Sequence, residues 1–416
     1  MHRKRILILG GGRYNVRSVA AARAAGFFTI VADRSADAPA FAAAELSLPI
    51  DLNDCDALLQ AVSKHGGIDG VVSMAEVGVR SAAHISALLK LPSISEQAAA
   101  NCTSKAAMRR LWRQIGEYST EFAIASSVEE GRQAAKAMAF PLIVKPDRSF
   151  GGSRGVTRIE AVEELPDAFR AAQAGGLPNS EVVIERCIDG TEHSAEVLIW
   201  GGSTSLLCIG QKVKSLPPYR VDVSVQYPAQ LTAFEESRIE DMCQRAVQAL
   251  GMTQGAAHVE FAYTDGGPVL FEVGARCGGG HTPQIAHHVS GVDEFVEACR
   301  MACGLAPSQF RALQRRGADY RFLIFPPGTV DAVNIPKALA NSPGVLDVDV
   351  TLCRGDTIRP LRSTSERAGF LVTTGDSLAE AVERANAGCR EIFLRYADGT
   401  VRHAAELMEF QELAHS

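Results

Sequence analysis

This 416-residue chain lacks long hydrophobic runs, paired cysteines and an excess of basic residues. No apolar stretch reaches the roughly 18 residues that a membrane-spanning helix needs. The ten cysteines are scattered without a CxxC pair, which weighs against structural zinc and against a disulfide framework. A net charge of −6 gives no electrostatic footprint for nucleic acid or an anionic membrane. These absences favour a cytoplasmic protein with reduced thiols.

The amino terminus begins with basic residues and a short apolar run, as a signal peptide does. The run breaks at Gly10 and is too short for that role, so a first strand is the better interpretation. Up to about residue 98, apolar strands alternate with amphipathic helices. The strands are expected at 6–9, 27–32, 46–50 and 68–73, and the helices near 15–25, 54–64 and 77–90. This alternation predicts a Rossmann-like parallel sheet covered by helices.

The rest of the chain changes character. A helix is expected at about 103–115, and Ser127–Glu130 predicts a capping box for a second helix that runs to Phe140. From about residue 181 the pattern is one of longer strands joined by tight turns. We expect strands at 182–186, 192–200, 205–211, 258–263 and 269–273, helices near 235–250 and 291–303, and an α+β tail at 318–410. The fold class is therefore α/β followed by α+β.

Glycines follow the first strand in the run Gly10–Asn15, and Asp33 ends the second strand. This order nearly matches a dinucleotide-binding fingerprint, in which glycines let the backbone approach a pyrophosphate. Asn15 stands where the third glycine belongs. We therefore favour a tight strand–helix turn that binds no NAD.

A more specific signal begins with Lys145-Pro146 at a strand end, followed by the loop Asp147–Val156. Its small residues let backbone N–H groups converge on phosphate oxygens, and the lysine adds a point charge. No Gly-Lys-Ser/Thr follows, so it is not a Walker A loop. The alternative is a mobile surface hairpin.

Two acidic strands come later, with Glu260 in one and Glu272 in the other. Their period-two alternation and a three-residue loop, Asp265–Gly267, predict that the glutamates lie opposite each other on one face. Two such carboxylates repel unless a cation lies between them, and Mg²⁺ shared with nucleotide phosphates is the natural occupant. Arg276 could hold a substrate carboxylate or the transferring phosphoryl group. Two solvated glutamates in a hairpin are the alternative.

Weaker signals lie elsewhere. The strand that carries Glu185 enters a short connector whose backbone could bind an adenine edge, and Glu192 could accept from ribose hydroxyls. An ordinary strand–turn–strand is the favoured alternative there. We interpret Cys277 as a packed thiol and His287-His288 as a helix pair rather than a metal site. His281, after three glycines, could line a substrate site or pack in the interior.

Taken in this order, the residues resemble the ATP-grasp superfamily, and the resemblance covers nearly the whole chain. It implies a Rossmann-like domain at 1–98, a linker helix and small lobe at 99–186, a large lobe at 187–310 and a C-terminal part of that lobe at 311–416. It also implies that ATP and Mg²⁺ are the cofactors, with Mn²⁺ as an alternative metal.

The resemblance assigns roles position by position. Lys105 and Lys145 would hold the α- and β-phosphates, and the loop residues Ser149, Gly151, Gly152 and Ser153 would close over the β- and γ-phosphates. Glu185 and Ile188 would bind adenine mainly through backbone atoms, while Glu192 binds ribose. Glu260 and Glu272 would bind the metal, and Arg276 would steady the acyl phosphate.

Within the superfamily, the run from Glu272 to His281 is most similar to the L-amino-acid ligases. That similarity implies a substrate site formed by Glu76, Arg276, Gly279 and His281. Two departures from these families matter. Gly274 stands where the superfamily often has Asn, which implies that water replaces one side-chain ligand of a second Mg²⁺. The stretch Val223–Pro228 lacks the acidic residue and the His that some dipeptide ligases carry, which leaves the activated substrate open.

The resemblance implies a ligase that activates a carboxylate as an acyl phosphate and joins it to an amine. A carrier protein as the acceptor and a homodimer stay open. One rival is a carboxylase or formate-type ligase acting on a purine precursor, but we find no basic cluster for a ribose phosphate. An NAD-dependent oxidoreductase would explain nothing after residue 100. A nucleotide-binding regulatory protein would not need Glu260, Glu272 and Arg276 together.

Overall fold

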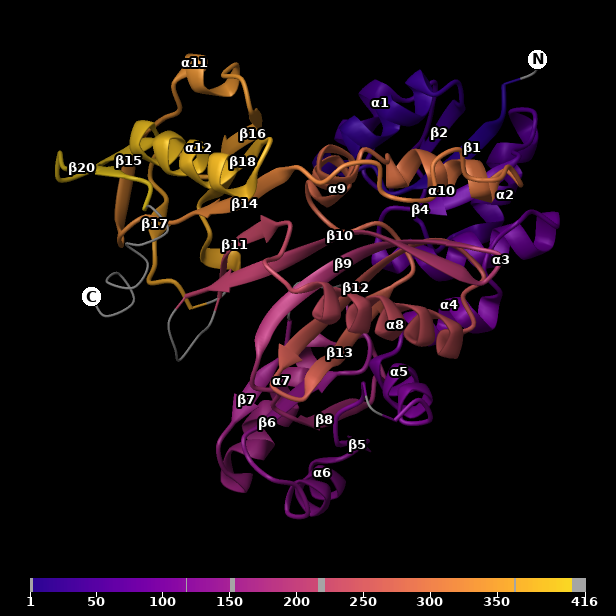
Figure 1. Ribbon diagram of the computed structural model, residues 1–416, viewed down its shortest axis with the longest axis horizontal. Coiled ribbons are helices and arrows are strands. Elements are labelled where there is room, and N and C mark those ends of the chain that lie inside the picture. The colour runs from indigo at the N-terminus through magenta and orange to yellow at the C-terminus, as the bar shows by residue number, and fades with distance from the viewer. Residues whose placement is uncertain (1–2, 117, 150–153, 216–220, 363, 406–416) are drawn as a thin grey trace.

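A computed structural model of the chain describes residues 3–116, 118–149, 154–215, 221–362 and 364–405. The amino-terminal unit lies beside a large central sheet, the small lobe projects from that sheet, and the carboxy-terminal unit lies at its far end (Figure 1). The fold is mixed α/β, as the sequence predicted. In the described part of the chain, no helix combines the length and the hydropathy that a bilayer span requires.

The amino-terminal unit is built on a parallel sheet in the order β3-β2-β1-β4. Its strands are β1 (Arg5–Leu9), β2 (Phe28–Ala32), β3 (Leu46–Leu48) and β4 (Gly70–Ser73), and its helices are α1 (Val16–Ala24), α2 (Cys55–Lys64) and α3 (Val79–Leu89). Ile6 and Ile8 pack into one core and Leu7 and Leu9 into another. Both faces of the sheet are therefore covered, as its nearly continuous apolar strands require.

Two short helices, α4 (Glu96–Cys102) and α5 (Lys105–Trp112), lead into the small lobe. This lobe is an antiparallel sheet in the order β5-β8-β6-β7. The strands are β5 (Phe122–Ala125), β6 (Leu142–Pro146), β7 (Thr157–Ile159) and β8 (Val182–Arg186), and the helices are α6 (Val128–Ala135) and α7 (Leu165–Gly175).

Helix α6 is shorter than the sequence predicted. Ser127 caps it as expected, but the carboxylate of Glu130 accepts from the backbone N–H of Ser126 rather than from that of the cap residue. The helix ends at Ala135, because the N–H groups of Ala137 and Met138 bond to carbonyls three residues back instead of four. Pro141 also disfavours a helical backbone at Phe140.

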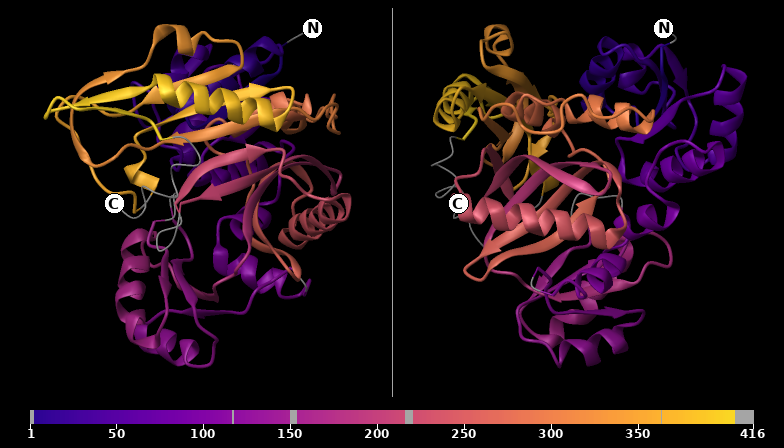
Figure 2. Two further views of the ribbon diagram at one scale, coloured as in Figure 1. Left: turned by 60° about the vertical axis from the view of Figure 1, so that its left-hand side comes forward. Right: turned by 45° about the vertical axis from the view of Figure 1, so that its right-hand side comes forward.

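The central sheet has eight strands in the order β13-β12-β9-β10-β11-β14-β18-β16. The first five places belong to β13 (Gly267–Gly274), β12 (Gln254–Thr264), β9 (Thr191–Trp200), β10 (Ser203–Lys214) and β11 (Asp222–Tyr227). Helix α8 (Ala233–Leu250) lies across one face (Figure 2). The extent of helix α9 (Thr282–Ser290) was not predicted, although its His287-His288 pair was interpreted as helical. Helix α10 (Glu294–Ala302) shares a core with the amino-terminal sheet.

The carboxy-terminal unit continues the same sheet. β11 pairs with β14 (Gly317–Leu323), which pairs with β18 (Gly369–Gly375) and, through it, β16 (Val345–Val350). Helix α12 (Leu378–Glu391) packs on β18 and β14. A separate small sheet contains β15 (Gly328–Asn334), β17 (Thr357–Ile358), β19 (Phe393–Tyr396) and β20 (Val401–His403), and α11 (Lys337–Ala340) precedes β16. We keep the division of the chain at 98, 186 and 310 as a proposal, and the sheet crosses the last of these boundaries.

Candidate active site

One face of the central sheet carries charged side chains in a row. On β12, Val259 and Phe261 pack into the core beneath α8. Because side chains alternate along a strand, the neighbouring His258 and Glu260 lie on the opposite face. The register of β9 and β12 sets His258 directly opposite Glu196. Sequence alternation therefore separates the structural face of the sheet from the polar one.

Glu260 lies opposite Glu272 across β12 and β13. The loop that produces this register differs from the predicted one. Thr264 pairs with Gly267, so two residues form the turn instead of three. A bulge at Phe271 adds one residue to β13, which restores the parity that brings the two glutamates to the same face.

Basic groups surround the two glutamates. Lys105 Nζ lies 3.0 Å from Glu272 Oε1, and Lys212 Nζ lies 3.2 Å from Glu260 Oε2. Burial alone would raise the pKa of both carboxyls, but Lys212 and His258 hold the pKa of Glu260 well below its usual range. Lys105 lowers the pKa of Glu272 in the same way. Both carboxylates are therefore ionised at neutral pH.

The donor set fits a magnesium ion that is shared with phosphates. Within the described residues, no group of three or more His, Cys, Asp or Glu side chains is placed to enclose a metal. Two carboxylates leave several positions of an octahedral ion to phosphate oxygens and water, which is how Mg²⁺ is usually bound. Gly274 adds no ligand, and a Cβ there would lie 3.4 Å from Glu76 Oε2.

A buried charge cluster links α5 to the small lobe. Glu185 accepts from Arg109 Nε at 2.7 Å and from Lys145 Nζ at 2.5 Å. Burial lowers the pKa of Lys145 to about 8. The pKa of Glu185 falls to about 2, because Arg109 and Lys145 outweigh the effect of its burial. Glu185 lies on the inner strand β8, in register with Phe122 of β5 and Ile143 of β6, so its adenine contact stays a prediction.

The other predicted nucleotide contacts are spread over the small lobe and β9. Glu192 lies 2.6 Å from Lys214 Nζ. Ile188 lies half-buried in the connector between β8 and β9. Ser149 forms an isolated bridge with Gly176, whereas Gly151, Gly152 and Ser153 lie outside the described residues. The roles of these residues stay predictions.

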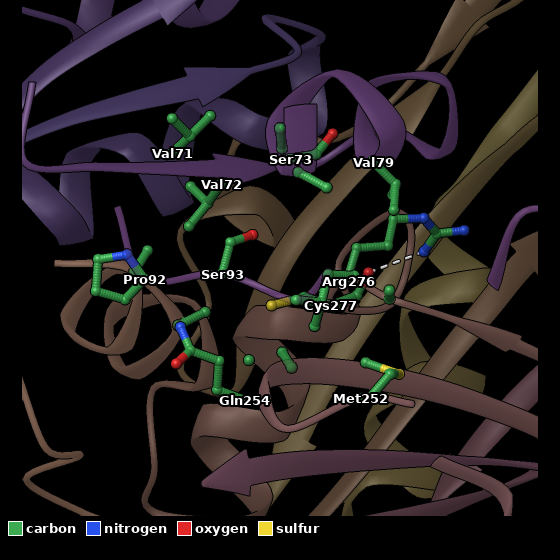
Figure 3. A pocket seen from close by; sticks show the side chains of 18 of the residues that line it. Val71, Val72, Ser73, Val79, Pro92, Ser93, Met252, Gln254, Arg276 and Cys277 are labelled. Atoms are coloured by element: carbon green, nitrogen blue, oxygen red, sulfur yellow. Dashed lines mark hydrogen bonds between the residues drawn. The ribbon is translucent and has the colours of Figure 1, made fainter. Parts of the chain in front are cut away.

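Arg276 lies where β13 leaves the central sheet. Its Nε donates to Glu76 Oε2 at 3.1 Å, and its Nη1 donates to the carbonyl of Cys277 at 2.8 Å. A small cavity of about 70 Å³ lies between Arg276, Cys277 and β4, whose Val72 and Ser73 line its other side (Figure 3). Burial raises the pKa of Glu76 although Arg276 opposes the effect. The structure thus brings together Glu76 and Arg276, which are 200 positions apart.

A second cavity of about 210 Å³ lies between the glycine turn of the amino-terminal unit and Gly278–Gly280. Gly279 lines it, together with Tyr14 and Met74. His281 is instead packed among aromatic rings, with its centroid 4.8 Å from that of Phe370 and 5.3 Å from that of Tyr14. Burial lowers its pKa to about 4, so the imidazole is neutral at neutral pH.

The other motifs have structural partners. Asp33 accepts from the backbone N–H of Gly11 at 2.8 Å, so it fastens the glycine turn. A Cβ at Gly11 would lie 2.8 Å from that of Ala38. Cys277 is buried, and burial raises its pKa well above the usual range. His288 faces the carbonyl of Gly375.

Sequence reasoning missed the basic residues that neutralise the site. Arg109 follows Lys105 by one helical turn, so both lie on one face of α5. Lys212 and Lys214 are two residues apart on β10, and Glu192 and Glu196 are four residues apart on β9. Because side chains alternate along a strand, each pair lies on one face. These spacings were available in the sequence. Only the sheet order, however, shows that Lys212 reaches Glu260.

Comparisons with known proteins agree along the chain. Residues 19–93 match the family described as ATP-grasp N-terminal domain, residues 138–284 match ATP-grasp domain, and residues 321–397 match L-amino acid ligase C-terminal domain 2. The chain is 29% identical to the uncharacterized protein y4rH of Sinorhizobium fredii over 80% of this chain and 70% of that protein. It is 27% identical to a formate-dependent phosphoribosylglycinamide formyltransferase of Synechococcus sp., over 94% of this chain and 97% of that enzyme.

Among solved structures, an L-amino acid ligase from Bacillus licheniformis superposes with a TM-score of 0.80 at 25% identity, over 95% of this chain and 99% of that one. A biotin carboxylase from Campylobacter jejuni superposes with a TM-score of 0.72 at 17% identity, over 99% and 95% of the two chains. The second likeness shows the shared fold alone.

Proposed function

The chain belongs to the ATP-grasp superfamily of carboxylate–amine ligases, and on that premise we propose that it activates an amino-acid carboxylate and joins it to an amine. The products would be an amide or peptide, ADP and phosphate. The match of residues 321–397 to an L-amino acid ligase domain supports an amino acid as the activated substrate.

One observation carries this proposal. Glu260 and Glu272 lie opposite each other as ionised carboxylates, with Lys105 at one and Lys212 at the other. Arg276 donates to Glu76, whose carboxylate also interacts electrostatically with Glu272 and Lys105, so a cation for the substrate lies on the same side of the site as the predicted metal ligands. A protein that only bound nucleotide would not need this cation beside the metal.

The reaction requires no covalent bond to the enzyme. A substrate carboxylate oxygen attacks the γ-phosphorus of ATP, the bond from that phosphorus to the bridging oxygen breaks, and ADP leaves. The amine nitrogen then attacks the acyl carbon, phosphate departs with its oxygen, and the amine loses a proton. The enzyme contributes positioning and charge neutralisation.

The residues divide this work. Lys105 and Lys145 would hold phosphate oxygens, and Glu260 and Glu272 would hold Mg²⁺. When bound there, Mg²⁺ would neutralise charge on the phosphate groups. Arg276 would hold the carboxylate and then steady the charge that develops on the acyl phosphate.

The second candidate is a formate-type ligase acting on a phosphorylated purine precursor, which the similarity to the formyltransferase favours. Such a substrate needs cations for its ribose phosphate. The nearest arginines to the glycine turn are already paired, because Arg13 lies 2.7 Å from Asp349 and Arg17 lies 3.8 Å from Asp347. We therefore place the amino-acid ligase first.

The test is Mg²⁺-dependent release of ADP and phosphate from ATP, screened against pairs of amino acids with mass spectrometry of the products. Release that needs two substrates and yields an amide would support the proposal. The same screen with purine-precursor ribonucleotides, supplied with formate or bicarbonate, tests the second candidate. Turnover in that arm alone would overturn the first.

A further inference from the structure

A carboxylate that the proposed mechanism does not use lies beneath the site. Glu196 on β9 is fully buried, with 0% of its surface exposed. Its Oε1 lies 2.6 Å from His258 Nδ1, and its Oε2 accepts from the backbone N–H of Gly278 at 3.1 Å. A buried carboxylate is costly unless it is paired and hydrogen-bonded. Glu196 meets this requirement with two partners from different parts of the site.

The first partner leads to the predicted metal ligand. His258 Nε2 lies 3.3 Å from Glu260 Oε1. The imidazole therefore bridges two carboxylates, one at each ring nitrogen. On the β13 side, His258 is paired with Gly274, which has no side chain. On the β9 side, it is paired with Glu196. The orientation of Glu260 Oε1 thus depends on the orientation of this ring.

The second partner leads to the predicted substrate arginine. Gly278 follows Arg276 by two residues and begins the glycine segment that lines the second cavity. A Cβ at Gly278 would lie 2.4 Å from Thr282 Cγ2 and 2.9 Å from His258 Nδ1. The backbone is therefore close against the imidazole, and the bond from Gly278 to Glu196 fixes it there.

We propose that Glu196 is a positioning residue that aligns Glu260, through His258, with the segment that follows Arg276. The inference rests on the proposed function, because it concerns the same site. Groups that orient metal ligands from behind typically change metal affinity or activity by about 10–100-fold when they are replaced. Glu196 would act on both halves of the site at once, since its two oxygens serve one half each.

The experiment compares Glu196→Gln with a matched control, Glu297→Gln. Glu297 is also a buried carboxylate, and it accepts from the backbone N–H groups of Ser308 at 2.8 Å and Gln309 at 3.1 Å. It lies on α10, outside the charged row. Both variants lose a buried charge, so both report the general cost of that loss through their melting temperatures.

The decisive measurement is Mn²⁺ binding in the presence of ADP, followed by electron paramagnetic resonance of free Mn²⁺. We expect Glu196→Gln to bind Mn²⁺ about 10–100-fold more weakly than the unsubstituted protein, and Glu297→Gln to bind it equally well. Equal affinity in Glu196→Gln would overturn the inference. An equal loss in both variants would also overturn it, because general destabilisation would then explain the effect.

A second variant covers the case in which Glu196→Gln does not fold. His258→Asn removes the contact with Glu260 and leaves Glu196 bonded to Gly278, so a similar loss of Mn²⁺ affinity is expected, and an unchanged affinity would contradict the inference. Because the readout is metal binding, it stays informative even if no amino acid supports turnover. Weaker Mn²⁺ binding by Glu196→Gln, together with no turnover on any pair of amino acids, would refute the proposed function and leave the role of Glu196 intact.

Discussion

The low pKa of Lys145 leads to a measurable pH dependence of nucleotide binding. Lys145 is buried, and its pKa is lowered from 10.5 to about 8. If Lys145 holds a phosphate group, only its charged form binds the nucleotide well. Nucleotide binding therefore raises the pKa of Lys145, and the lysine takes up a proton. The ordinary lysine would show this effect only at a much higher pH.

The size follows from the titration. The apparent dissociation constant scales as one plus the ratio of neutral to charged Lys145 in the free protein. With a pKa of about 8, this factor rises from about 1.1 at pH ~7 to about 11 at pH ~9, so affinity falls roughly tenfold, or about 1.4 kcal/mol.

The assay is calorimetric titration with a non-hydrolysable ATP analogue and Mg²⁺ across this pH range. Two buffers with different ionisation heats report the proton uptake, which should approach one proton per nucleotide at the upper end. Lys145→Arg is the control, because arginine stays charged throughout, and its affinity should not change with pH. An unsubstituted protein whose affinity is flat, with no proton uptake, would refute the reasoning.

Three further predictions concern the same region. Glu185→Gln leaves Arg109 and Lys145 as buried cations without a carboxylate, so we expect the free energy of unfolding in urea to fall by about 3–5 kcal/mol. Lys145→Met is the control, because it leaves Arg109 and Glu185 as an ion pair without net charge. A loss in Glu185→Gln no larger than that in the control would contradict this expectation. Arg276→Ala should keep nucleotide affinity but lower kcat by about a hundred- to a thousandfold, and ligation at an unchanged rate would exclude its role. Gly278→Ala places a methyl group 2.4 Å from Thr282 Cγ2 and should cost about 1–3 kcal/mol of stability, which a thermal melt at wild-type temperature would disprove.

The layout of strands and helices followed from local patterns. The strand at 182–186 was predicted with both ends correct, because its β-branched residues and flanking turns leave little choice. Only the His287-His288 pair of helix α9 was interpreted as helical, and the start of the helix was missed because it follows three glycines and carries Pro283 in its first turn. Proline is in fact favourable there, since its missing N–H has no partner at that position in any helix.

The candidate site was less accessible to sequence reasoning. The opposition of Glu260 and Glu272 was predicted from parity, yet it is produced by a two-residue turn and a bulge at Phe271. Bulges have no strong local signature, because they depend on how neighbouring strands twist. The contact between Lys212 and Glu260 depends on strand order in the sheet, which no single segment encodes.

The continuous central sheet has a practical consequence for anyone who shortens this protein. Because β11 pairs with β14 from Ser224 to Tyr227, cutting the chain after residue 310 would strip β11 of that neighbour. Its N–H and C=O groups would then form an exposed edge, which is a template for aggregation between molecules. Loss of the last hundred or so residues would therefore favour self-association through the uncovered edge of β11. Binding studies should use the intact chain for this reason.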